Sequence, residues 1–118
     1  METKDLGKTS LGMQANVSAL LSYVLGLITG IIFYLIEKDN KFVRFHAIQS
    51  MITFGGLLVI SLANSFILRI MLPWQISSLI SGAIGIIGLV LWVVLMIKAF
   101  QGDYFKLPII GDIAEKNA

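Results

Sequence analysis

The sequence contains no cysteine, which excludes disulfide bridges, thiolate metal sites and cysteine nucleophiles. It contains a single histidine, His46, and every acidic residue lies outside the long apolar runs. These shortages leave no plausible catalytic triad, dyad or metal cage. We therefore expect a protein that is not an enzyme, with no catalytic residues, no metal site and no cofactor.

Charge is also scarce, because Asp, Glu, Lys and Arg make up 14% of the chain, against about 25% in soluble domains. Hydrophobic residues make up 57% of the 118 residues, and the mean hydropathy is +0.87. A soluble domain of this size has too much surface for so few polar side chains, so membrane lipid is the expected surrounding. The basic residues are scattered between apolar runs, which argues against a nucleic-acid partner.

Three uncharged runs are each long enough to cross a hydrocarbon core of about 30 Å. They predict an all-α integral membrane bundle of three transmembrane helices, with spans over about 16–36, 47–68 and 73–100 and the second helix starting near residue 42. Residues 1–15 would form an N-terminal tail and residues 101–118 a short interfacial C-terminal segment. A cleaved signal peptide is the alternative for the first run, which is too long for an h-region.

Three crossings would place the two termini on opposite sides of the membrane. The side of the N-terminus and second loop would carry three basic residues, and the side of loop 37–46 and the C-terminus would carry six. The positive-inside rule then predicts that loop 37–46 and the C-terminus are cytoplasmic and the N-terminus outside, in a multi-pass plasma-membrane protein.

The stretch "KFVRFHAIQS" at residues 41–50 concentrates polar groups beside the second apolar run. On a helix, His46, Gln49, Ser50 and Thr53 share one stripe about 100° wide. Because an unsatisfied polar group in lipid costs several kcal/mol, this stripe should face a helix, another subunit or water. Both a ligand-binding vestibule and simple hydrogen bonding between helices fit the pattern.

Aromatic and basic residues around the stripe predict anchors at the membrane interface. The expected anchors are Lys41, Phe42, Arg44, Phe45, Tyr104 and Lys106. The C-terminal segment should lie along the membrane surface or fold back onto the bundle, where Asp103 or Asp112 could pair with His46 or Arg44.

Small residues recur at spacings of three and four in the first and third runs, where they favour close helix packing. The predicted packing positions are Ser18, Ser22, Gly26, Gly30, Ser78, Gly82, Gly85 and Gly88. These ridges could pack within one chain or form a homo-oligomer, or contact a partner membrane protein.

Two motifs carry a family resemblance: VRFHA-x-QS at Val43–Ser50 and Y-x-K-x-P-I-x-GDIAE at Tyr104–Glu115. With them, the chain resembles a family of small prokaryotic membrane proteins of largely unknown function, distantly related to the channel-like component of the chloroplast inner-envelope protein import machinery. The resemblance implies an α-helical membrane protein with its signature around Arg44, Phe45, His46 and Gln49. It supplies no biochemical activity.

Two classes of function remain open from the sequence. The first, which the sequence favours, is an oligomeric pore, transporter or translocation-associated subunit, and it is supported by the polar stripe, the small-residue ridges and the family resemblance. The second is a structural or interaction protein that organises lipid or a larger membrane complex, which suits the short loops and the lack of catalytic groups.

Overall fold

The computed structural model describes residues 6–118, and within them the chain forms helices and no strands. This confirms the predicted all-α class. The elements are α1 (Ala15–Val24), α2 (Leu27–Ile36), α3 (Lys41–Ala63), the π-helical turn η1 (Asn64–Leu68), α4 (Arg69–Met71), α5 (Trp74–Phe100) and α6 (Ile110–Asn117).

Among residues 6–118, two helical stretches are long and apolar enough to cross a membrane, Lys41–Met71 and Trp74–Phe100. The prediction of three crossings is therefore wrong, because the first apolar run is not one helix. It breaks at Gly26 into α1 and α2, each of 10 residues and about 15 Å long. Gly26 has φ +59° and ψ −112°, a conformation that glycine tolerates and side-chain-bearing residues avoid.

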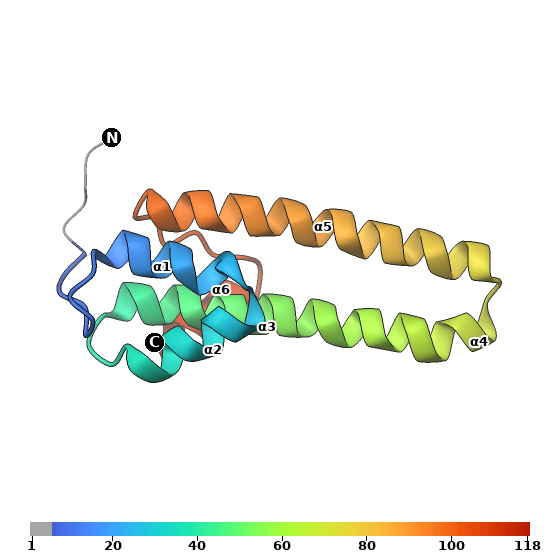
Figure 1. Cartoon of the computed structure of the whole chain (residues 1–118), viewed down its shortest axis with the longest axis horizontal. Coiled ribbons are helices and arrows are strands. Elements are labelled where there is room, and N and C mark those ends of the chain that lie inside the picture. Colours follow the sequence, from blue (N-terminus) through green and yellow to red (C-terminus); the bar gives the residue numbers. More distant parts are fainter. Residues whose placement is uncertain (1–5) are drawn as a thin grey trace.

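The break turns the first run into a helical hairpin, with α2 running back beside α1 toward the starting end (Figure 1). Backbone groups at its tip have side-chain partners, as they need in apolar surroundings. The Trp92 indole donates to Tyr23 O at 2.8 Å, the Ser50 hydroxyl to Gly26 O at 2.8 Å, and the Thr29 hydroxyl to Ser22 O at 2.9 Å. Thr29 Oγ1 also accepts from Leu25 N at 3.1 Å.

The hairpin places residues 6–14, the loop 37–40 and the segment 101–109 at one end of the molecule, here called the hairpin end. Asn40 Nδ2 donates to Leu6 O and Lys8 O, and Asn16 Nδ2 donates to Phe100 O. The prediction that the N-terminal segment and loop 37–46 lie on opposite sides is therefore wrong. Seven basic residues belong to the hairpin end: Lys8, Lys38, Lys41, Arg44, Lys98, Lys106 and Lys116. Arg69, in α4, lies at the opposite end.

Beyond the hairpin tip, α3, η1 and α5 continue as a pair of helices (Figure 1). One polar group joins them there. The buried Asn64 amide donates to Ser77 O at 3.1 Å and Ser81 Oγ at 2.6 Å, and accepts from Ser77 Oγ at 3.1 Å. The outer faces of this half are apolar and exposed, as at Val59, Ile86 and Leu79.

The predicted packing residues divide into two groups. Ser18 and Ser22 are buried on α1, and Gly30 on α2 lies against α3. They do not form one continuous ridge, because the turn at Gly26 separates the two helices. On α5, Gly88 lies near Leu57, whereas Ser78 is exposed and a Cβ added at Gly82 or Gly85 would meet no atom within 4 Å.

Gly30 offers a sharp test of the contact between α2 and α3. A Cβ there would lie 3.0 Å from Ala47 O and 3.2 Å from Met51 N, both backbone atoms that cannot move aside. We expect Gly30→Ala to lower the free energy of unfolding by about 1–3 kcal/mol, the usual cost of overpacking. Thermal unfolding in detergent measures this, with Gly56→Ala as the control, since Gly56 is helical and a Cβ there would meet no atom within 4 Å. Alanine is the better helix former, so the control should be neutral or stabilising.

Candidate functional site: a buried network around His46

The polar stripe of α3 faces the interior of the hairpin end, where His46, Gln49 and Ser50 are fully buried. His46 Nδ1 lies 2.7 Å from the Tyr23 hydroxyl of α1, and His46 Nε2 lies 2.9 Å from Asp103 O of the C-terminal segment. Three of the four predicted stripe residues thus have hydrogen-bond partners. Thr53 Oγ1 is buried without a partner among the described residues, as is Ser18 Oγ.

The partners assign the protons of this network. A carbonyl oxygen only accepts, so His46 Nε2 carries the hydrogen and donates to Asp103 O. Nδ1 therefore accepts from the Tyr23 hydroxyl, whose oxygen accepts from Gln49 Nε2 at 3.0 Å. A second proton on His46 would turn the Tyr23 hydroxyl hydrogen away from its acceptor. The arrangement thus holds a neutral imidazole in one orientation.

Gln49 fastens the C-terminal segment to α3. Its Nε2 donates to Phe105 O at 2.9 Å, and its Oε1 accepts from Leu107 N at 3.0 Å. The amide thus pairs with one edge of an extended backbone, as a neighbouring strand would. Together with the His46–Asp103 bond, this side chain docks residues 103–107 against the helix. The segment folds back onto the bundle, which is one of the two placements expected from the sequence.

Phe42 and Phe45, two of the predicted interfacial anchors, do not face lipid. Both are buried, and their rings make edge contacts with the His46 ring at centroid distances of 4.6 and 4.9 Å. Tyr104 packs edge-on against both phenylalanines and is itself exposed. The docked C-terminal segment covers these two residues, which is why a helix considered alone misplaces them.

Arg44 caps α2 rather than reaching for head groups. Its Nη1 donates to Tyr34 O at 3.2 Å and Glu37 O at 2.8 Å, and its Nε donates to Ala118 O at 3.2 Å. A guanidinium at the end of α2 satisfies terminal carbonyls and complements the helix dipole. Of the two aspartates expected to pair with His46 or Arg44, Asp103 contacts His46 through its backbone carbonyl, and Asp112 lies 3.5 Å from Lys106.

The remaining predicted anchors, Lys41 and Lys106, are exposed at the hairpin end. Lys106 Nζ lies 2.8 Å from Glu115 Oε1, so it ties the C-terminal segment to α6. Lys41 lines a surface pocket of about 280 Å³ with Phe45, Tyr104, Glu115 and Ala118.

A second cluster, around Glu37, joins the N-terminal segment to the loop before α3. The Glu37 carboxylate accepts from Ser10 Oγ at 2.7 Å, from Ser10 N at 2.9 and 3.0 Å, and from the backbone N–H groups of Asp39 and Asn40. Burial raises the pKa of this carboxyl, but these hydrogen bonds outweigh it and hold the pKa below its ordinary value of 4.5.

This cluster predicts a dependence of stability on pH. Because the pKa of Glu37 is lowered by folding, its contribution is fully present above the ordinary value and is lost as the pH falls through the lower folded value. Glu37→Gln should therefore destabilise the protein at neutral pH, and the difference from the wild type should shrink in acid. Melting temperatures of both proteins at several pH values measure this, and a difference that grows in acid would contradict it.

The sequence did not single out Tyr23 or Trp92, although both belong to the network. A signal existed, because a tyrosine or tryptophan within an apolar run usually finds a hydrogen-bond partner when buried. In the sequence, Glu37 and Asn40 stand out only as polar residues of loop 37–46. Their partners lie about 30 residues away in the chain, and no local pattern reveals such contacts.

The arrangement binds segments together and offers little chemistry. Gln49 donates to Tyr23, Tyr23 donates to His46, and His46 donates to the backbone carbonyl of Asp103. The chain of hydrogen bonds therefore ends on a group that cannot pass on a proton. Among residues 6–118, no group of three or more His, Cys, Asp or Glu side chains is placed to hold a metal ion.

Two long apolar helices with a shorter helical hairpin packed against one end are typical of a small membrane protein. The chain belongs to the magnetosome magnetite crystal formation protein family, whose sequence model matches residues 8–114.

Relatives named UPF0132 membrane proteins support the same class. One from Methanocaldococcus jannaschii is 50% identical over 111 residues, covering 94% of both chains. One from Archaeoglobus fulgidus is 47% identical over 104 residues, covering 88% of this chain and 95% of the relative. No solved structure matches the chain. The resemblance to a small prokaryotic membrane family is confirmed, whereas the link to chloroplast import gains no support from these matches.

Proposed function

We propose that this protein is a non-enzymatic structural membrane protein that associates with further copies of itself and so organises lipid or a larger membrane complex. The proposal rests on one observation: the polar stripe of α3 faces the interior of the molecule. His46, Gln49 and Ser50 are fully buried and bonded to segments of the same chain. A pore or transporter would instead present such side chains to water along a path.

The half of α5 beyond the hairpin tip supports the self-association. Ser77, Ser81 and Gly88 face α3, whereas Ser78, Gly82 and Gly85 form a stripe about 90° away around the helix. Small side chains let a second backbone approach closely in lipid, where no hydrophobic force drives helices together. This stripe, Ser78–Gly82–Gly85, is the proposed contact between copies.

The distribution of charge supports a cytoplasmic hairpin end in the plasma membrane. Among the described residues, seven Lys and Arg residues belong to that end and one to the other, a stronger asymmetry than three crossings would give. The name of the family refers to magnetosome magnetite crystal formation, and we propose no metal chemistry for this chain.

Cysteine cross-linking tests the association, because the chain has no native thiol. Gly82→Cys should form disulfide-linked dimers in membranes on mild oxidation. Ile87→Cys, exposed on another face of α5, is the matched control and should stay monomeric. Equal cross-linking at the two positions would count against the proposed contact.

A flux assay separates the two classes of function. Purified protein in liposomes should release no trapped ions or small solutes beyond protein-free vesicles. Solute release that His46→Ala abolishes would overturn the structural assignment and favour a pore.

A further inference from the structure

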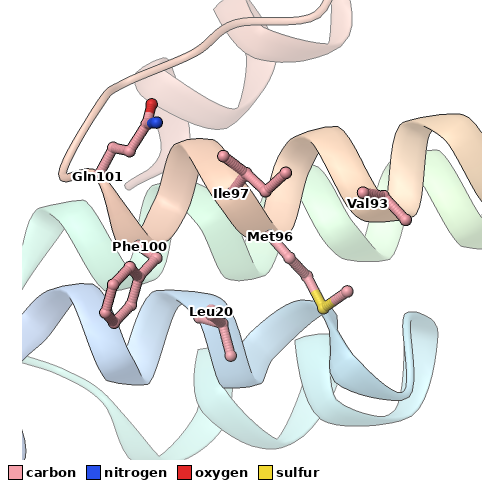
Figure 2. Close-up of a pocket in the computed structure, with 6 residues that line it drawn as sticks. All are labelled: Leu20, Val93, Met96, Ile97, Phe100 and Gln101. Carbon is pink, nitrogen blue, oxygen red and sulfur yellow. The ribbon is translucent and has the colours of Figure 1, made fainter.

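An apolar groove runs between α1 and α5 near the hairpin end, away from the His46 network. Figure 2 shows Met96 and Phe100 of α5 reaching toward Leu20 of α1, with Val93, Ile97 and Gln101 in a second row along α5. The groove has a volume of about 350 Å³. Five of its six lining side chains are apolar, and the one amide, Gln101, stands at the end of α5.

The dimensions of the groove limit what can fill it. Its rows run from Val93 to Gln101, eight residues or about 12 Å along the helix, which approaches the roughly 15 Å hydrocarbon depth of one leaflet.

The groove is continuous with the apolar outer surface, because Val93, Ile97 and Phe100 are 41%, 49% and 42% exposed. Around a membrane-crossing helix such a surface faces acyl chains, so lipid has direct access to the groove.

We propose that this groove holds one acyl chain of a membrane phospholipid, aligned along α5 with its polar end beside Gln101. The groove follows the axis of a membrane-crossing helix, so a chain lying in it keeps the direction of its leaflet. Its deep end is apolar, whereas the Asn16 amide, bonded to Phe100 O at 3.0 Å, lies near the mouth. The short helix α1 thus forms one wall of a lipid site in addition to packing on α5.

Photolabelling tests the site with the full-length protein in phosphatidylcholine vesicles that contain graded amounts of a phospholipid with a diazirine in one acyl chain. Mass spectrometry of the peptides maps the label. Labelling of Leu20, Met96 and Phe100 should saturate at a low fraction of the probe, while labelling around Ile86, 66% exposed on the same helix, should rise linearly. Linear labelling at both places would show ordinary boundary lipid and overturn the site.

Variants that fill the groove provide the second readout. Leu20→Trp and Met96→Trp should each lower the saturable labelling about tenfold, equivalent to about 1.4 kcal/mol. Ile86→Trp, the matched control, should leave it unchanged, and unchanged labelling in the filled variants would contradict the proposal. The saturation curve needs only the wild type, so misfolding of a variant does not decide the result. High-yield disulfide dimers of Leu20→Cys would instead assign the groove to a second copy.

Discussion

Replacing Gln49 with leucine should lower the free energy of unfolding by about 2–4 kcal/mol and release the C-terminal segment from α3. The substitution removes the hydrogen bonds to the Tyr23 hydroxyl, Phe105 O and Leu107 N. Each bond contributes from about 0.6 kcal/mol between helices in a membrane to about 1.5 kcal/mol in proteins generally. The total is large because leucine leaves two partly buried backbone groups, Phe105 O and Leu107 N, without their present partner.

Two measurements follow the effect of Gln49→Leu. Thermal unfolding in detergent should show the loss of stability, and limited trypsin digestion should cleave at Lys106 sooner than in the wild type. Gln75→Leu is the matched control, since Gln75 is an exposed glutamine at the far end of α5. Equal trypsin sensitivity of Gln49→Leu and the wild type would mean that Gln49 does not hold the segment.

Replacing Gly26 with alanine should destabilise the helical hairpin by about 3 kcal/mol. Alanine at φ +59° and ψ −112° stores about 1–3 kcal/mol of backbone strain. Its Cβ would also lie 3.1 Å from Cγ and 3.3 Å from Cβ of Phe54, and such overpacking costs a further 1–3 kcal/mol or so. The substitution thus acts on both the turn and its contact with α3.

Tryptophan fluorescence should report the change in Gly26→Ala, because the Trp92 indole is bonded to Tyr23 O at the hairpin tip. The emission of Trp92 should shift, and the unfolding midpoint should fall. Gly56→Ala is the control, since Gly56 is helical and a Cβ there would meet no atom within 4 Å. If Gly26→Ala unfolds like this control, the sharp turn at Gly26 is not required.

The two long helices can be predicted from the sequence, because hydropathy and length are enough to identify an uninterrupted apolar helix. The charged stretch before the second apolar run indicates a helix that starts near residue 42. The preference of proline for helix beginnings indicates that the last long helix starts near Pro73. The first run met the same length criterion and still failed as a span. Hydropathy records how apolar a run is, and Gly26 was interpreted as a packing residue rather than as a turn.

For the His46 network, the sequence predicts which side chains share a face but not which groups they bind. Helical periodicity placed His46, Gln49 and Ser50 on one face, and the structure brings their side chains to α1, to the hairpin tip and to the C-terminal segment. The partners themselves, Tyr23 and the carbonyls of Asp103 and Phe105, lie more than 20 residues away along the chain. Such contacts depend on the fold-back of the first run, which the sequence analysis did not anticipate.

The sidedness of four single-cysteine variants tests the central claim, that residues 15–36 form a hairpin and not a span. Lys8→Cys, Asp39→Cys and Asn117→Cys each carry the label site at the hairpin end, and Leu72→Cys carries it at the opposite end. With a membrane-impermeant maleimide, the account predicts that the first three react from one side of the membrane and Leu72→Cys from the other. Reaction of Lys8→Cys and Asp39→Cys from opposite sides would contradict it.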